Sequence, residues 1–150
     1  MSRWGIVWTV AGLSLLFAQC APADPDSLRR DPGASGEFVV NLPLKTVYAN
    51  EQRGFLACMT GWYYTMRFAI QPRIDEAHKS ASIVLVHHGA WKDIWAVVDM
   101  KADKTVTTVH AYTTGHALMK DFPDVSHGWA TGDFRCQQYS ITTQQMPFSE

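Results

Sequence analysis

The sequence lacks the short patterns that mark several known kinds of active site. It contains no C-x-x-C pair, no H-E-x-x-H and no G-x-S-x-G. The first pattern supplies a redox dithiol, and the second supplies two zinc-binding imidazoles with a catalytic carboxylate. The third places a serine nucleophile on a strained turn. A glycine-rich loop able to hold phosphate groups is also missing. The sequence therefore predicts no enzyme of these classes and no bound cofactor.

Basic residues are neither in excess nor clustered. The chain has 13 Lys and Arg residues against 14 Asp and Glu residues, and its formal net charge is -1. A protein that binds nucleic acid needs a basic face that neutralises several phosphates. The charge pattern therefore argues against nucleic acid as a partner.

Only one stretch is apolar enough to enter a membrane, and it lies at the start of the sequence. Arg3 precedes an apolar run over 4–18, which small residues follow. This is the pattern of an export signal, and the run is marginal in length for a transmembrane helix. We therefore interpret residues 1–23 as a signal peptide and expect the rest of the protein outside the cytoplasm.

Two ways of processing this signal are open. Cleavage before Cys20, in a lipobox-like stretch, would leave an acylated cysteine that anchors the protein to a membrane, and Ala21 after it favours the outer membrane. Cleavage after Ala23, in an A-x-A sequence, would release a soluble periplasmic protein that begins at Asp24. We favour the lipoprotein, because a cysteine at position 20 is otherwise hard to explain.

Cysteine is scarce, with three residues in the whole chain. Either processing route leaves Cys58 and Cys136 in the folded part. In an oxidising compartment, two otherwise isolated thiols are expected to pair. Because the loop between them is long, the chain-entropy argument predicts a stabilisation of about 4 kcal/mol.

The rest of the chain divides into three parts. Residues 24–36 are rich in Pro, Gly and charge, which predicts a flexible tether. Residues 37–140 have the length of one domain, for which we expect a globular α+β fold. We interpret residues 141–150 as a C-terminal tail.

Two segments have the apolar spacing of amphipathic helices. Apolar residues fall on one helical face over 44–58, while Glu51 and other polar residues lie largely elsewhere. Asn41 is expected to cap this helix. A second helix is predicted over 122–131, with Gly132 as its left-handed stop.

The remaining patterns indicate strands joined by short connections. Alternation of apolar and polar residues is clear over 62–71. The other expected segments are strands over 38–40, 80–88, 91–100 and 105–112, a polar connection over 72–79 and a hairpin turn over 101–104. The order β-α-β-β-β-β-α predicts a two-layer α+β fold, in which two helices cover one face of an antiparallel sheet of about five strands. Helix-grip and TATA-binding-protein-like folds share this order, which concerns architecture alone.

Aromatic and histidine side chains on the open face of that sheet are the candidate binding residues. Such a patch suits contact with a protein or a glycan. In the strand over 91–100, alternation predicts that Trp95 and Val97 share the side opposite to Ile94. The residues of the possible binding face are Tyr63, Trp91, Trp95, His110 and Tyr112.

Histidine offers one alternative site. His110 and Tyr112 share a face of their strand, and His116 could fold back beside them after Gly115. With Asp121 or Asp124 nearby, the two imidazoles could bind zinc or serve a hydrolase. Because the spacing matches no zinc motif, we predict no metal site and keep these two histidines as the alternative.

Two short motifs resemble a known group of proteins. They are Val47-Tyr48 followed by Cys58, and Trp129-Ala130-x-Gly132-Asp133-x-x-Cys136. In these residues, and over the region 39–136, the chain resembles small uncharacterised envelope lipoproteins of proteobacteria. The resemblance implies a lipidated N-terminus but no activity, and it implies that Trp129 packs, Gly132 ends a helix and Cys136 forms a bridge.

The expected function follows from the signal, the paired cysteines and the missing catalytic motifs. We expect a non-enzymatic lipoprotein of the bacterial cell envelope, anchored in the outer membrane through Cys20 and facing the periplasm. Its partner would be an envelope protein or a glycan. The alternatives are a periplasmic metal-binding protein or hydrolase that uses His110 and His116, and an exported inhibitor of a hydrolase.

Overall fold

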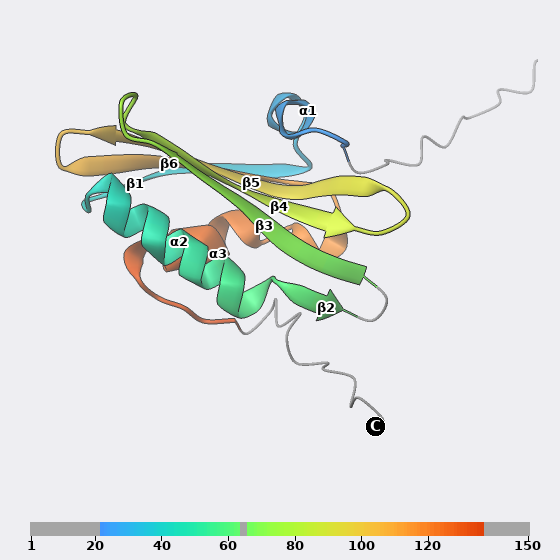
Figure 1. The fold of residues 1–150 in the computed structure, drawn as a ribbon. Helices are drawn as coiled ribbons and strands as arrows, with labels where there is room; N and C mark the ends of the chain where they lie inside the picture. The colour runs from blue at the N-terminus through green and yellow to red at the C-terminus, as the bar shows by residue number, and fades with distance from the viewer. Residues whose placement is uncertain (1–21, 64–65, 137–150) are drawn as a thin grey trace, which may run out of the picture.

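One antiparallel sheet forms the centre of the domain. The computed structural model describes residues 22–63 and 66–136, so Cys20 and the predicted tail over 141–150 lie outside the described residues. The sheet has six strands in the order β1-β6-β5-β4-β3-β2, which confirms the predicted α+β class (Figure 1). The elements are α1 (Pro25–Arg30), β1 (Ala34–Val40), α2 (Leu44–Cys58), β2 (Gly61–Tyr63), β3 (Met66–Asp75), β4 (Ser80–His88), β5 (Lys92–Asp103), β6 (Val106–Thr113), the 3-10 helix η1 (Ala117–Met119) and α3 (Phe122–Thr131).

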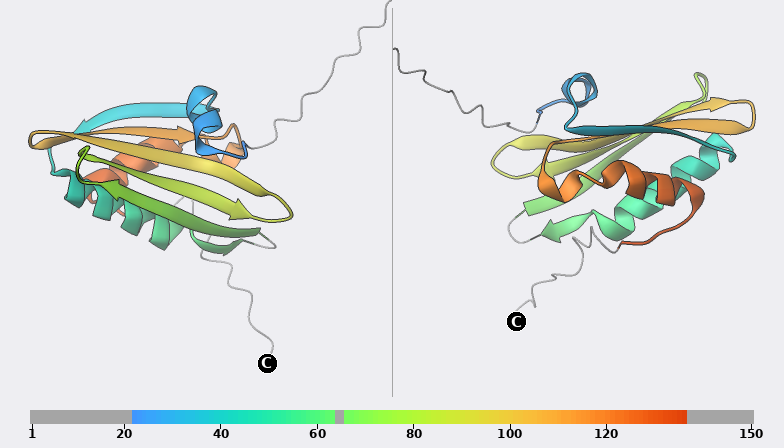
Figure 2. Two further views of the ribbon diagram at one scale, coloured as in Figure 1. Left: turned by 45° about the horizontal axis from the view of Figure 1, so that its top comes forward. Right: turned by 180° about the vertical axis from the view of Figure 1, so that it is seen from behind.

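Helices α2 and α3 cover one face of the sheet, as predicted. They lie side by side beneath it in Figures 1 and 2. Trp129 of α3 meets Phe55 of α2 edge to face, with 5.4 Å between the ring centroids, and both are fully buried. The strands complete this core with apolar side chains that alternate along β4, β5 and β6, chiefly Ile83, Leu85, Ala96, Val98, Val109 and Ala111.

The ends of the two helices follow different rules. Gly132 ends α3 with φ of 96°, the left-handed conformation that glycine adopts without strain. Asn41 does not cap α2, because the helix begins one residue after Pro43, whose carbonyl accepts the amides of Thr46 and Val47. Pro43 has no side-chain donor or acceptor, so this end is closed by backbone hydrogen bonds alone.

The segment predicted as one strand over 62–71 is a hairpin. Tyr63 pairs with Met66, so β2 folds back on β3. β3 then continues to Asp75, and residues 72–75 are strand rather than the predicted connection. Beyond Phe68, none of the described strands pairs with the outer side of β3, and Pro72 is tolerated there because an edge strand can omit one amide donor.

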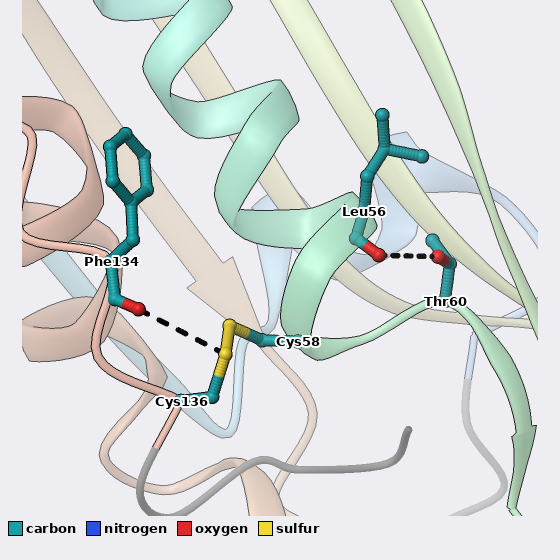
Figure 3. Close-up of a disulfide and its surroundings, with 5 residues drawn as sticks. All are labelled: Leu56, Cys58, Thr60, Phe134 and Cys136. Atoms are coloured by element: carbon teal, nitrogen blue, oxygen red, sulfur yellow. Dashed lines mark hydrogen bonds between the residues drawn. A yellow bond between two sulfur atoms is a disulfide. The ribbon is translucent and has the colours of Figure 1, made fainter. Parts of the chain in front are cut away.

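A disulfide joins the end of α2 to the segment after α3. Cys58 is buried at the last turn of α2 and bonds to Cys136, as the sequence predicts (Figure 3). The two residues are 78 positions apart. The bond therefore closes a loop that contains five of the six strands and α3.

A carboxyl group is buried between α2 and α3. Glu51 is fully buried, although the helical pattern places it away from the core. Ser126 of α3 donates a hydrogen bond of 2.7 Å to its Oε1 atom, and its Oε2 atom has no partner among the described residues. Burial raises the pKa of Glu51 from 4.5 to about 8, against a smaller opposing effect of the Ser126 hydrogen bond. At neutral pH this side chain is a neutral acid.

The predicted tether over 24–36 is wrong. Residues 25–30 form α1, and Ala34 already belongs to β1. Asp24 caps α1 by accepting a 2.8 Å hydrogen bond from the amide of Ser27, and Pro25 occupies the first helical turn. This short helix lies on the face of the sheet opposite to α2 and α3 (Figure 2).

Removing the disulfide should destabilise the domain without changing its fold. We expect the double variant Cys58→Ala/Cys136→Ala to lose about 2–5 kcal/mol of unfolding free energy, because the unfolded chain regains the freedom of a long loop. Urea denaturation followed by circular dichroism measures the change. Dithiothreitol should lower the stability of the natural protein but not of the variant, and equal effects on both would contradict the bond.

The charge state of Glu51 predicts a pH dependence of stability. Between pH 4.5 and pH 8 its carboxyl is ionised in the unfolded chain and protonated in the fold. The unfolded state then binds fewer protons, so the unfolding free energy should fall as pH rises, by about 1.4 kcal/mol per pH unit from this group. Glu51→Gln should remove that slope in urea denaturation at pH 5, 6, 7 and 8. The exposed Glu76→Gln is the control, and parallel curves for Glu51→Gln and the natural protein would refute a buried neutral acid.

Candidate functional site

A row of polar side chains crosses the outer face of the sheet, which is the face opposite to α2 and α3. On β6 the alternation is regular: Val109 and Ala111 are buried in the core, and His110 and Tyr112 lie on the outer face. Residues directly opposite on neighbouring antiparallel strands have Cβ atoms about 4.5–5.5 Å apart. Such pairs connect the whole row, which in spatial order is Glu37, His110, Asp99, Ser82 and Arg73.

Helix α1 covers one half of this outer face. Leu28 is 1% exposed and packs in a cluster with the outward-facing apolar residues of β4 and β5. Tyr112 packs against the same cluster. The other cluster members are Val84, Val86, Ile94 and Val97. The covered half is therefore apolar, and the polar row lies at its border.

An arginine of α1 joins the helix to the polar row. The guanidinium of Arg29 donates to both carboxylate oxygens of Asp99, over 2.6 and 2.7 Å, and to the hydroxyl of Ser82 over 3.3 Å. It also pairs with Asp26 one turn earlier, over 2.6 Å. The hydrogen bond to Asp99 raises the pKa of Arg29 further above its ordinary value. A bidentate pair of this kind is among the stronger hydrogen-bonded contacts in proteins.

The uncovered half of the outer face is hollowed. The hollow has a volume of about 560 Å³. It is lined by residues of β3, β4, β5 and β6, among them Asp99, which Arg29 of α1 binds. The side chains that line it are Arg73, Asp75, Ser80, Ser82, Asp99, Lys101, His110 and Tyr112.

In the hollow, both carboxylates have hydrogen-bond partners, but Arg73 and Lys101 have none that is an acid in the part of the chain that the structure describes. Asp99 is bound by Arg29, and Asp75 accepts hydrogen bonds from the amide and ring of His78, which lower the pKa of Asp75. Arg73 and Lys101 are exposed and make no ion pair within the described residues. The hollow therefore presents two cations that no acid in 22–63 or 66–136 neutralises through an ion pair.

An aromatic pair borders these cations. The rings of His110 and Tyr112 are almost parallel, with an interplanar angle of 8° and 6.3 Å between centroids. His110 also approaches Glu37 of β1, with 3.4 Å between Nδ1 and a carboxylate oxygen. This contact lies at the edge of the sheet, where the Glu37 side chain is 63% exposed.

The predicted binding face is not one surface. His110 and Tyr112 line the hollow as expected, but Trp95 is 9% exposed and belongs to the core under α2 and α3. The cause is an irregularity in the pairing of β4 with β5, where Val86 opposes Ile94 and Leu85 opposes Ala96. The extra residue is Trp95, so alternation breaks there.

The other two predicted aromatic residues lie away from the hollow. Trp91 is 80% exposed in the turn between β4 and β5, at the opposite end of these strands from Lys101. Tyr63 is in β2, at the edge of the sheet farthest from β1, and the position of its side chain is not described. Neither residue can be counted with His110 and Tyr112.

The two histidines of the alternative site are separated by the sheet. The ring of His116 contacts that of Trp95 in the helix-covered core, with 4.8 Å between the centroids and a tilt of 37°, whereas His110 lies on the outer face. Within the described parts of the chain, no group of three or more His, Cys, Asp or Glu side chains is arranged to hold a metal ion.

Comparison with known proteins gives no match: no family model, no curated protein and no solved structure matches this chain. Among the helices within 22–63 and 66–136, none is long and apolar enough to cross a membrane. The site is therefore interpreted from its own geometry.

Of the residues that line the hollow, alternation in the sequence predicts only His110 and Tyr112 as binding residues. The three cations of the site fall in other predicted segments: Arg29 in the tether, and Arg73 and Lys101 in connections. For Arg29 a signal was present, since Asp24-Pro25-x-Ser27 is a helix start with a capping side chain. For the other two, only the pairing of β3, β4 and β5 shows that they share a face.

Loss of the Arg29 contact should loosen α1 selectively. In Arg29→Met, Asp99 keeps its partly buried position without its partner, and we expect a loss of about 1–2 kcal/mol in unfolding free energy. Hydrogen exchange should become faster over 22–31 and at the amide of Ile94, which donates to the carbonyl of Pro22. Arg30→Met, on the same helix but bonded only to Ser27, is the control. Identical exchange in the two variants would contradict the contact.

Proposed function

We propose that this protein is a non-enzymatic lipoprotein of the cell envelope whose outer-face hollow binds an acidic glycan. The observation that carries this proposal is the pair of unneutralised cations in a hollow whose own carboxylates are already bound. An anionic ligand would meet Arg73 and Lys101 without displacing an existing ion pair.

The other groups in the hollow suit a sugar. Ser80 and Ser82 contribute hydroxyl-bearing residues to the lining, and His110 and Tyr112 contribute two nearly parallel rings. Sugars are bound by polar groups that accept and donate hydrogen bonds together with aromatic surfaces that cover their apolar C–H faces. An acidic glycan combines these needs with negative charge.

The geometry favours binding over catalysis at this site. Ser82 and His110 lie two strands apart, about 10 Å at the usual strand spacing. Asp99 lies between them and is held by Arg29. A serine that is activated by an adjacent histidine requires a direct hydrogen bond between the two. The arrangement also gives the alternative hydrolase no paired histidines, because His116 lies on the other side of the sheet.

Placement in the envelope is supported by two features. The Cys58–Cys136 bond suits an oxidising compartment. The segment before Pro22 has the composition of an export signal and carries Cys20, the acylation site that we propose. Release as a soluble periplasmic protein is the alternative, and the mass of the mature N-terminus decides between the two. For the inhibitor hypothesis the structure offers no particular support.

The glycan proposal is tested by co-sedimentation with purified peptidoglycan sacculi, which carry free carboxylates. We expect Arg73→Glu/Lys101→Glu to bind at least about tenfold more weakly than the natural protein, equivalent to about 1.4 kcal/mol. Lys120→Glu, a charge reversal outside the hollow, should bind normally.

Sacculi whose carboxyl groups have been amidated provide the second control. The natural protein should bind them as weakly as the double variant binds native sacculi. Equal binding by all three proteins, or equal binding to native and amidated sacculi, would overturn the proposal that the hollow recognises an acidic glycan.

A further inference from the structure

The N-terminal end of the described chain is fixed to the sheet. The amide of Ile94 donates a 2.8 Å hydrogen bond to the carbonyl of Pro22. Asp24 then caps α1, whose Leu28 is buried in the outer-face cluster. Figures 1 and 2 show this end of the chain beside β5, on the side of the sheet that carries α1. The chain therefore leaves the domain at a defined place.

This place is close to the candidate anchor. Cys20 precedes Pro22 by two residues, which span at most about 7 Å of extended chain. An acylated Cys20 would hold the end of β5 near the lipid headgroups, because no flexible tether separates the two. The part of the domain nearest to Ile94 would then face the membrane.

The turn between β4 and β5 is that part. Trp91 precedes Ile94 by three residues, about 10 Å along the strand. It is 80% exposed, the highest exposure of the large apolar side chains that the structure describes. An exposed indole is costly in water and favourable at a membrane surface, where its ring meets both apolar and polar groups.

Because side chains alternate along β5, the two charged residues that follow Trp91 point to opposite faces of the sheet. Lys92 is exposed and shares the outer face with Ile94. Asp93 points to the other side, where its carboxylate lies 3.4 Å from Nδ1 of His87. Asp24, two residues after Pro22, is exposed, and its carboxylate accepts hydrogen bonds from the amide and hydroxyl of Ser27. Lys92 is thus placed to meet lipid phosphates beside the indole.

We propose that the turn between β4 and β5 is a membrane contact, in which Trp91 enters the headgroup region next to acylated Cys20. This inference rests on the lipoprotein part of the proposed function. It fixes the orientation of the domain: Lys101 follows Ile94 by seven residues, about 23 Å along β5. The hollow would therefore face away from the lipid, toward the space in which a glycan is met.

The test uses full-length protein purified from envelope membranes, after its N-terminal peptide has been identified by mass spectrometry. The acylated protein is reconstituted in phosphatidylcholine vesicles with brominated acyl chains, which quench nearby tryptophan fluorescence. We expect a quenched component of the emission that is lost in Trp91→Phe. Trp91→Phe/Leu56→Trp, which moves the exposed indole to α2 on the opposite face, should not restore it.

The outcomes separate this inference from the function on which it rests. Acylated protein with equal quenching in the natural chain and Trp91→Phe would overturn the membrane contact and leave the lipoprotein standing. Restored quenching in the Leu56→Trp variant would also overturn it, since the domain would then lie on the membrane in more than one orientation. A mature N-terminus at Asp24 would overturn both the membrane contact and the lipoprotein part of the proposed function, and would leave the glycan-binding hollow to its own test.

Discussion

The packing of α1 against the outer face of the sheet is the contact on which the hollow and the position of the N-terminal end depend. Leu28 covers an apolar half of the sheet that would otherwise be exposed, and Arg29 binds Asp99 at the border of that half. Apolar burial supplies the stabilisation, and the bidentate ion pair sets the position. This one turn and a half of helix thereby determines where the hollow begins and where the chain leaves the domain.

Local patterns in the sequence predict most of the fold. The helices Leu44–Cys58 and Phe122–Thr131 and the strand Ser80–His88 have the bounds that their apolar spacing indicates, and the cysteine pairing is correct. The predictions from local patterns are wrong where contacts between distant segments determine which side chains are buried. Glu51 is buried because α3 packs over it, and Trp95 turns inward because β4 and β5 shift register. Neither event leaves a local trace in the sequence.

The candidate site was predicted only in part, for the same reason. His110 and Tyr112 could be placed on one face by alternation within β6, which is a local property. Their neighbours in the hollow come from β3, β4 and β5, and the strand order brings them together. Two ends of one outer face then serve two proposed roles. In our proposals, the end beside Ile94 meets the membrane and the end beside Lys101 binds the ligand.

The packing of α1 against the sheet is tested most directly by nuclear magnetic resonance of protein with 13C-labelled methyl groups. The account predicts nuclear Overhauser effects between the methyl groups of Leu28 and those of Ile94 and Val97, together with methyl shifts of Leu28 displaced from random-coil values. Random-coil shifts for Leu28 without these effects would show α1 detached from the sheet. Both the border of the hollow and the proximity of Cys20 to the turn between β4 and β5 would then be lost.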